Sequence, residues 1–288
     1  MGLRINTNVP SLAAQRSLRN TNEALSDNLS KLSSGRRIVK SADDAAGMAI
    51  SSRLTAKIRG NYQAERNAND GISLVQIAEG GLNESQNILT RMRELAIQAA
   101  SDTIGDPERK LAEMEYQDIK NELDRISKVT EYNGAKLLDG TGGKFDIQVG
   151  VQNNPFNDRI TFDAGRVNAT LDSLGLGASK EDADDSVSGV SILTKEAARD
   201  SLDRVDNALS KVAESRATLG AVQNRLQSTI QNLQIAGENL SAANSRILDA
   251  DYAKEISENA RLNILANAGI SALAATNQRN SMVLKLLG

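Results

Sequence analysis

The sequence has no cysteine, no histidine and no tryptophan, and only 2% of its 288 residues are aromatic. The chain can therefore form no disulfide, use no thiol nucleophile or histidine base, and build no metal site from histidine and cysteine ligands. These absences remove large classes of enzymes. We expect a protein with no catalytic activity, no cofactor and no metal.

Proline is also scarce, with three residues, whereas 40% of the chain is hydrophobic and 25% is charged. A wide protein interior is normally filled by aromatic rings, but a thin bundle of long helices can be filled by leucine, isoleucine, valine and alanine. This composition is typical of coiled-coil rods.

A basic surface is absent, because the formal net charge is -3. Without basic patches and stacking rings, a nucleic acid partner is not expected. Membrane insertion is not expected either, since the longest weakly apolar stretch, residues 264–275, is short and contains Asn267, Gly269 and Ser271. The first residues, MGLRINTNVP, lack the apolar core of a secretory signal. We therefore expect either a cytoplasmic protein or one that is exported without cleavage of a signal peptide.

Residues 194–247 contain an apolar residue at every seventh position and no proline, which predicts one long helix with a narrow apolar seam. A coiled-coil seam also uses a second position in each heptad, here three residues before each repeating apolar residue. Arg216, Gln223, Gly237 and Asn244 occupy such positions, a combination that a parallel zipper rarely tolerates. We therefore expect antiparallel partner helices from the same chain. The repeating positions are Val205, Val212, Leu219, Leu226, Leu233, Leu240 and Ile247.

Two earlier segments have the periodicity of such partners. Residues 50–101 form the first, with a seven-residue repeat that leaves Thr90, Arg91 and Glu94 on the solvated face. The second follows Asp106, the expected helix cap, and Pro107 in the first turn. Its apolar positions are Ala112, Tyr116, Ile119, Leu123 and Ile126.

The middle of the chain changes character. Residues 145–151 and 160–162 alternate apolar and polar side chains around the turn sequence NNPFND, which predicts a β-hairpin. The segment from Leu174 to about residue 190 is small, acidic and glycine-rich, and we expect a surface loop. Its acidic residues do not have the spacing of a calcium loop.

Both ends of the chain have helical apolar patterns. The N-terminal helix is expected to open after Pro10 with Ser11 as its cap and to end at residues 33–35. Two such helices paired antiparallel form a poor core, so the remaining apolar surface is expected to contact other copies of the chain. The residues assigned to these helices are Leu18, Leu25, Leu29, Leu32, Ile256, Ile264, Leu273 and Leu284.

These patterns predict a mainly α fold, an elongated antiparallel helical bundle or coiled coil with a small β-hairpin region. The expected parts are an N-terminal helix at 1–43, helices at 44–134, a hairpin and loop region at 135–190, a long helix at 191–246 and a C-terminal helix at 247–288.

Three long blocks carry a family resemblance. They are KLSSGRRIVKSADDAAGMAISSRL, RNANDGISLVQIAEGGLNESQNILTRMRELAIQAAS and NLSAANSRILDADYAKEISENARLNILANAGISALAATNQ, the last followed by VLKLL. With these blocks in this order, the chain resembles bacterial flagellin from end to end except in the middle. The resemblance implies terminal helices in the inner tube of a filament, called D0, and a three-helix bundle with a hairpin in the next shell, called D1. Outer domains are expected to be absent.

The resemblance further implies a subunit that polymerises with itself into the extracellular flagellar filament for swimming. Its implied partners are the flagellar export apparatus, an export chaperone, and the filament cap and junction proteins, with export that cleaves no signal peptide. The alternatives are a hook-filament junction protein, which shares the terminal helices, and a cytoplasmic coiled-coil scaffold.

A last implication of the resemblance is contact with a host Toll-like receptor. The family's contact motif is similar to RMRELAI, with Arg91, Glu94 and Leu95 matching and Thr90 in place of the usual glutamine; Glu115 aligns with a further contact. By the heptad count, Arg91 and Glu94 project from the solvated face and Leu95 lies at the edge of the seam. Alternatively, these residues serve filament packing alone.

Overall fold

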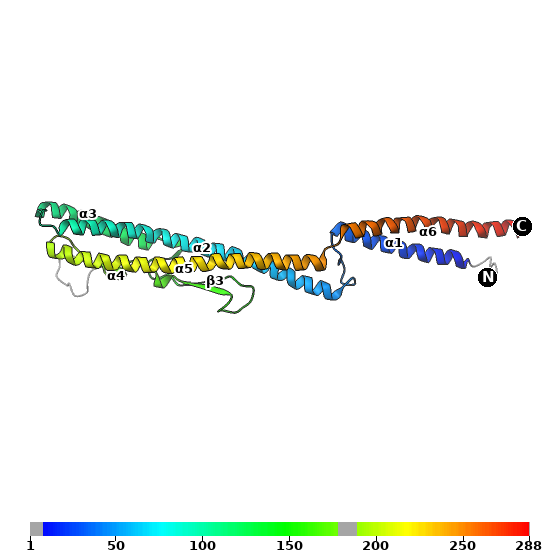
Figure 1. Ribbon diagram of the computed structural model, residues 1–288, viewed down its shortest axis with the longest axis horizontal. Coiled ribbons are helices and arrows are strands. Elements are labelled where there is room, and N and C mark those ends of the chain that lie inside the picture. The colour runs from blue at the N-terminus through cyan, green and yellow to red at the C-terminus, as the bar shows by residue number, and fades with distance from the viewer. Residues whose placement is uncertain (1–7, 178–188, 288) are drawn as a thin grey trace. The chain divides into compact units, whose positions relative to one another are not determined.

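The computed structural model describes residues 8–177 and 189–287, and the side chains of 8–177 and 189–278. These residues are mainly helical, with two short antiparallel strand pairs, so the predicted fold class is confirmed (Figure 1). The helices are α1 (Val9–Ser34), α2 (Ala45–Ala99), α3 (Asp106–Val129), α4 (Leu171–Leu174), α5 (Lys195–Leu248) and α6 (Tyr252–Leu287). The other elements are β1 (Glu131–Tyr132), β2 (Ala135–Lys136), β3 (Lys144–Gln148), β4 (Arg159–Asp163) and a 3-10 turn, η1 (Ala164–Arg166).

The chain divides into two compact units. The central unit is Arg59–Gly237, and the terminal unit combines Met1–Ile58 with Glu238–Gly288. Each of the long helices α2 and α5 contributes to both units.

The core of the central unit lies between α2, α3 and α5. Arg93 Nε is 2.7 Å from Asp206 Oδ1, and Gln234 Nε2 is 2.7 Å from Glu65 Oε1. Since a later residue of α5 meets an earlier residue of α2, the two helices are antiparallel, which confirms that the long helix finds its partner in the same chain. The first four repeating positions are fully buried: Val205, Val212, Leu219 and Leu226.

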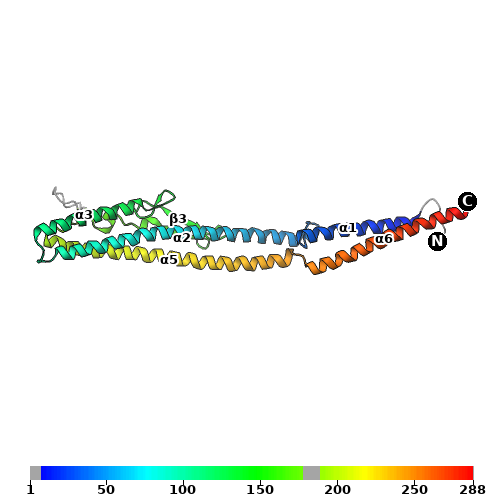
Figure 2. The ribbon, with the colours of Figure 1, turned by 90° about the horizontal axis from the view of Figure 1, so that it is seen from above.

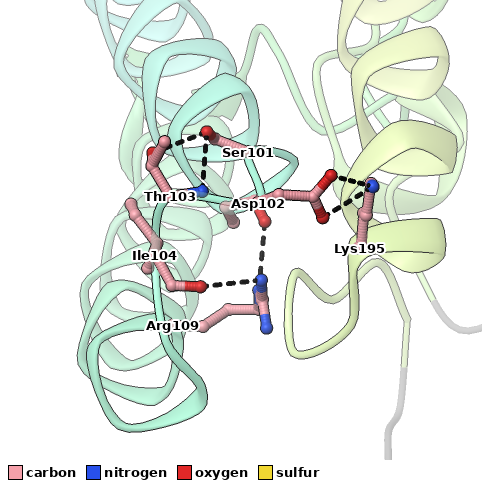
Figure 3. A network of polar contacts seen from close by, with 7 residues as sticks. Ser101, Asp102, Thr103, Ile104, Arg109 and Lys195 are labelled. Atoms are coloured by element: carbon pink, nitrogen blue, oxygen red, sulfur yellow. Dashed lines mark hydrogen bonds and ion pairs between the residues drawn. The ribbon is translucent and has the colours of Figure 1, made fainter.

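The end of this three-helix bundle is held by polar contacts of the loop between α2 and α3. Asp102 accepts two hydrogen bonds from Lys195 Nζ, at 2.6 and 2.5 Å, and so ties the loop to the start of α5 (Figure 3). Arg109 is buried and donates to the carbonyl oxygens of Ala99 and Ile104. The Ala99 carbonyl group is at the end of α2, where it would otherwise lack a helical partner, and the Ile104 carbonyl group belongs to the loop.

One detail of α3 differs from the expectation. Gly105 is the N-cap and Asp106 is the first helical residue, so the prediction of Asp106 as the cap is wrong. Asp106 instead accepts a hydrogen bond from Arg109 at 2.7 Å. A carboxylate at the first helical position still lies near the positive end of the helix dipole.

The predicted hairpin is confirmed as β3 and β4, with Phe145 opposite Phe162 and Ile147 opposite Ile160. A second hairpin, β1 and β2, surrounds the turn at Asn133 and Gly134, whose φ angles are 50° and 80°. The sequence indicated this turn but not its strands, because two-residue strands have no readable alternation.

Small residues of α2 let the larger hairpin approach closely. A Cβ atom on Gly71 would lie 2.5 Å from Ile147 Cδ1, and one on Gly60 would lie 2.8 Å from Val151 Cγ1. Between them, Asn67 Nδ2 donates to the carbonyl oxygen of Gln148 at 3.0 Å. Glycine at these helix positions costs helix propensity but makes room for the hairpin.

The segment after the hairpin is more buried than expected. Leu174, at the end of α4, and Leu176 are buried, so the prediction that a surface loop begins at Leu174 is wrong for these residues. Beyond the gap, Glu113 accepts a 2.6 Å hydrogen bond from the backbone of Ile192, which is also buried. The acids that failed the calcium-loop spacing, Asp182, Asp184 and Asp185, lie outside the described residues.

Candidate functional site

In the terminal unit, α1 and α6 lie side by side and run antiparallel (Figure 2). At one end Asn8 Nδ2 donates to the carbonyl oxygen of Thr276 at 3.3 Å. At the other end the Tyr252 hydroxyl donates to the carbonyl oxygen of Leu32 at 2.9 Å. The two ends of the chain therefore form one helical hairpin.

The boundaries of α1 follow from its capping residues. Asn8 is the N-cap and accepts a hydrogen bond from the backbone of Ser11 at 3.1 Å. Ser11 was expected in that role, but Pro10 fits within the first helical turn because its missing N–H needs no partner there. At the other end Gly35 has a φ of 67° and closes the helix, as expected from the sequence.

The fully buried residues of α1 are polar. Among its residues only Ser11 and Asn28 are buried, at 5% and 4% exposure. Ser11 Oγ donates to Asn277 Oδ1 at 3.0 Å. The stripe assigned from the sequence is less buried: Leu18, Leu25 and Leu32 are half-buried, and Leu29 is 51% exposed.

On α6, Leu262 is buried, whereas Ile256 and Ile264 are 57% and 68% exposed. Leu273 is half-buried, and Leu284 lies outside the residues whose side chains are described. Further exposed apolar residues of the pair were not among those assigned from the sequence. They are Val9, Leu12, Leu265 and Ile270.

The exposed isoleucines of α6 lie away from the face that contacts α1. Successive helical residues turn by about 100°, which places Ile264 roughly opposite the side that carries Leu262 and Leu273, and Ile256 and Ile270 on one flank between them. A helix that is apolar around its circumference is normally covered on all sides. The presence of apolar residues all around this helix is a sequence signal that could have identified Leu265 and Ile270 as well.

The connectors of the terminal unit are held by helix-end contacts. Asp44 accepts a 2.8 Å hydrogen bond from the backbone of Gly47 and so caps α2. Asp43 accepts from the backbone N–H groups of Lys40 and Val39, and these two bonds lower the pKa of its carboxyl group. Both carboxylates thus stabilise the local backbone.

The residues that match the receptor motif belong to the central unit. Arg91 Nη2 is 2.7 Å from Glu115 Oε1 on α3, and Arg91 Nη1 is 3.0 Å from Glu94 Oε2. All three side chains are about half exposed, and hydrogen bonding, first to Glu115 and then to Glu94, raises the pKa of the Arg91 guanidinium. The structure thus brings Arg91, Glu94 and Glu115 together on one face.

Leu95 does not share that face. Its side chain is 2% exposed and belongs to the apolar core of the central unit, so the expectation that it lies at an exposed edge of the seam is wrong. The cause is α3, which covers this side of α2 and widens its buried stripe. The exposed large apolar residues of the neighbouring helix α3 are instead Leu111, Met114 and Val129, at 67%, 65% and 55% exposure.

Across the described ranges 8–177 and 189–278, no group of three or more carboxylates has the arrangement of a metal site. No helix among the described residues combines the length and apolarity needed to cross a membrane. The chemistry that the terminal unit does offer is unpaired apolar surface on a helical hairpin. Such a surface is typical of a protein that associates with other copies of itself.

Comparison with known proteins names the family. The family model of the bacterial flagellin N-terminal helical region matches residues 5–142, and that of the C-terminal helical region matches residues 202–287. The flagellin of Halalkalibacterium halodurans is 43% identical over 98% of this chain and 99% of its own length. The flagellin of Bacillus subtilis is 41% identical over 99% of this chain and 100% of its own length.

A solved structure from Vibrio parahaemolyticus, described as flagellar hook-associated, is similar with a TM-score of 0.56. It covers 72% of this chain and 100% of its own, at 14% identity, which shows the shared fold alone. The chain belongs to the bacterial flagellin family, and it is a subunit of the flagellar filament. Flagellins are structural proteins of an extracellular polymer, as the sequence predicted.

Proposed function

We propose that α1 and α6 are the inner polymerisation element of this flagellin, formed by residues 1–43 and 247–288. The helices and hairpins of 44–134, 135–190 and 191–246 then form the surrounding shell. The observation that carries this proposal is the exposed apolar surface of α6, on which Ile256 and Ile264 project away from α1.

The arithmetic of burial favours association through this surface. Covering one isoleucine or leucine side chain contributes about 1.5–3 kcal/mol. A helical polymer repeats each contact at every subunit, so even a few such residues add up along the filament. Leu18, Leu25, Leu29, Leu32, Leu273 and Leu284 are assigned to the same element from their sequence pattern.

The proposal is tested by replacing Ile256 and Ile264 together with asparagine. The variant should remain a soluble monomer with an intact central unit, because the changed side chains lie outside the core. Lys254→Asn is the matched control, since it puts the same side chain at an exposed position of the same helix. Normal filaments of the double variant in negative-stain microscopy would contradict the proposal, as would normal filaments after deletion of residues 269–288.

We further propose that the subunit is exported without cleavage of a signal peptide. Its partners on that route are the flagellar export apparatus and an export chaperone, and in the filament they are the cap and junction proteins. The family relationship supports these partners. The intact mass of the subunit in purified filaments, compared with the encoded mass, tests the export route: a shorter N-terminus in filaments would contradict it.

The remaining alternatives are a hook-filament junction protein and a cytoplasmic scaffold. Relatives that are named flagellin align with nearly the full chain, whereas the hook-associated likeness is one of fold. We therefore propose the filament subunit proper, without enzymatic activity. The number of copies of this protein in isolated filaments distinguishes a filament subunit from a junction protein. A filament subunit is present along the whole filament, whereas a junction protein would be present only at the hook.

A second proposal is recognition of the monomer by a host Toll-like receptor through Arg91, Glu94 and Glu115. Three N–H groups of Arg91 donate to the two carboxylates, which fixes the guanidinium on an exposed helix face and leaves two N–H donors for a partner. Leu95 is left out, because its buried side chain cannot fill a receptor pocket without unfolding this part of α2.

Arg91→Ala should abolish receptor signalling by purified monomer while helical circular dichroism stays unchanged. Arg125→Ala is the control, because Arg125 forms a comparable exposed ion pair with Glu122 elsewhere on α3. Wild-type monomer that gives no signal would refute the proposal. Equal loss of signal in both variants would show that general surface charge, rather than this site, is responsible.

A further inference from the structure

On the α1 side of the antiparallel pair of α1 and α6, the buried residues are polar and the leucines that face α6 are only half-buried. Asn28, at 4% exposure, is the centre of the larger polar contact. Its Nδ2 donates to Glu255 Oε2 at 2.6 Å and to the Glu255 carbonyl oxygen at 3.1 Å, and its Oδ1 accepts from Asn259 Nδ2 at 2.9 Å. All three bonds cross from one helix to the other.

The apolar residues of this seam do not define a unique alignment. On α1, Leu18, Leu25 and Leu32 follow one another at intervals of seven residues, and Leu262 and Gly269 of α6 have the same spacing. Sliding one helix past the other by seven residues, about 10 Å, therefore brings similar positions together again. Such a shift also breaks the hydrogen bonds that Gly35 and Arg37 make with residues 247–250, and the rest of the connector, residues 38–44, is long enough to follow it.

The amide of Asn28 does distinguish the alignments. In the observed register it meets Glu255 and Asn259; after a shift of seven residues it would face the positions of Leu262 and Ala266, which offer no side-chain partner. A buried amide without hydrogen bonds is costly, and a single buried asparagine can set the register of paired helices. Ser11 repeats the arrangement near the other end, where it meets Asn277.

We propose that Asn28 is the positioning residue that sets the register of the terminal helices. This inference rests on α1 and α6 being the polymerisation element, and it adds a division of roles. Polar contacts select the partner helix and its alignment within the chain, and leucine and isoleucine side chains remain for contacts between subunits. A slipped hairpin would displace every one of those apolar residues along the filament axis.

Because the chain has no cysteine, the register can be measured with pairs of introduced cysteines. A Cβ on Gly269 would lie 3.9 Å from Leu18 Cβ, which is within the range that a disulfide requires. Leu18→Cys with Gly269→Cys therefore reports the native register. Leu18→Cys with Thr276→Cys reports the register slipped by seven residues, because Thr276 natively lies seven residues, about 10 Å, beyond Gly269 along α6.

The cysteine pairs are placed in full-length filaments with native α1 and α6, and in filaments that also carry Asn28→Leu and Asn259→Leu. This double change removes both amides together, so no amide is left buried without its partner. In the native background we expect the native disulfide and no slipped one. In the double-leucine background the ratio of native to slipped disulfide should fall about tenfold, while filaments still form.

Asn22→Leu, which makes the same change at an exposed position of α1, should leave the ratio unchanged. An unchanged ratio in the double-leucine background would overturn the role of Asn28, and an equal fall with Asn22→Leu would overturn its specificity. Absence of the Leu18 to Gly269 disulfide in otherwise native filaments, or its formation between two subunits, would instead contradict the α1 and α6 pairing on which the inference rests.

Discussion

Arg37 donates a hydrogen bond from Nη2 to the main-chain carbonyl oxygen of Ile247, at 2.8 Å. Its backbone N–H donates to the carbonyl oxygen of Leu248 at 2.7 Å. Both acceptors are in the last turn of α5, where carbonyl groups have no intrahelical partner. In the same way, the Tyr252 hydroxyl donates a hydrogen bond to the carbonyl oxygen of Leu32 at the end of α1. The connector after α1 thus caps the end of α5, and the first residue of α6 caps the end of α1.

This reciprocal capping predicts that Arg37→Ala weakens the terminal unit. Filaments of the variant should depolymerise at a lower temperature than wild-type filaments, because the end of α5 loses a charge-assisted hydrogen bond. Arg36→Ala is the control, since the neighbouring Arg36 takes part in the connector through its backbone. Equal melting of Arg37→Ala and wild-type filaments, followed by light scattering, would show that the bond has no role in stability.

Two adjacent glycines of α2 should respond oppositely to alanine. A Cβ on Gly80 would meet no atom within 4 Å, so Gly80→Ala should stabilise the central unit by about 0.5–1 kcal/mol. A Cβ on Gly81 would lie 2.6 Å from Leu138 Cδ1 and 2.8 Å from Thr130 Oγ1. Leu138 is fully buried, so Gly81→Ala should destabilise by about 1–3 kcal/mol. Urea unfolding of the monomer, followed by circular dichroism, measures both; shifts of the same sign would disprove this interpretation.

The buried Tyr116 should make the central unit sensitive to alkaline pH. Its hydroxyl makes no hydrogen bond to the described part of the chain, and burial raises its pKa above the ordinary value near 10, an effect that nearby Ser201 offsets only in part. The unfolded chain therefore ionises this tyrosine at a pH where the folded chain cannot. Stability from this group is complete below pH about 10 and declines as the pH rises further.

Tyr116→Phe removes this dependence and the unsatisfied hydroxyl together. The variant should be more stable than wild type by about 1 kcal/mol at neutral pH, and by a larger margin above pH 10. Urea unfolding at both pH values is the measurement. Loss of stability at neutral pH would mean that the hydroxyl has a favourable partner in the folded protein.

Limited proteolysis of the monomer should separate the two units. The central unit has three helices that bury one another's apolar seams, whereas α1 and α6 have only each other. Protease should therefore trim both ends and leave a resistant fragment of about residues 45–245, which contains Arg59–Gly237. Uniform resistance of the intact chain would contradict this expectation.

Much of the fold could be predicted because its signals are local and repeated. The seven-residue repeat of residues 194–247 specifies a long helix wherever it occurs, and alternation around Phe145 and Phe162 specifies a hairpin. The short β1 and β2 pair could not be predicted in the same way, since its geometry depends on a two-residue turn. Leu174 and Leu176 were placed on the surface because the composition around them is polar, but the neighbouring helices bury them.

The candidate sites show the same division. Periodicity placed Arg91 and Glu94 on the solvated side of α2, because exposure on a single helix follows its own pattern. It misplaced Leu95, since the width of the buried stripe depends on where α3 packs. The sequence by itself determined the helices, their apolar faces and the family. Only the tertiary structure decided that Asn28, rather than a leucine, is the most buried residue in its part of the terminal pair, because a polar side chain can be buried only where another segment supplies its hydrogen-bond partners.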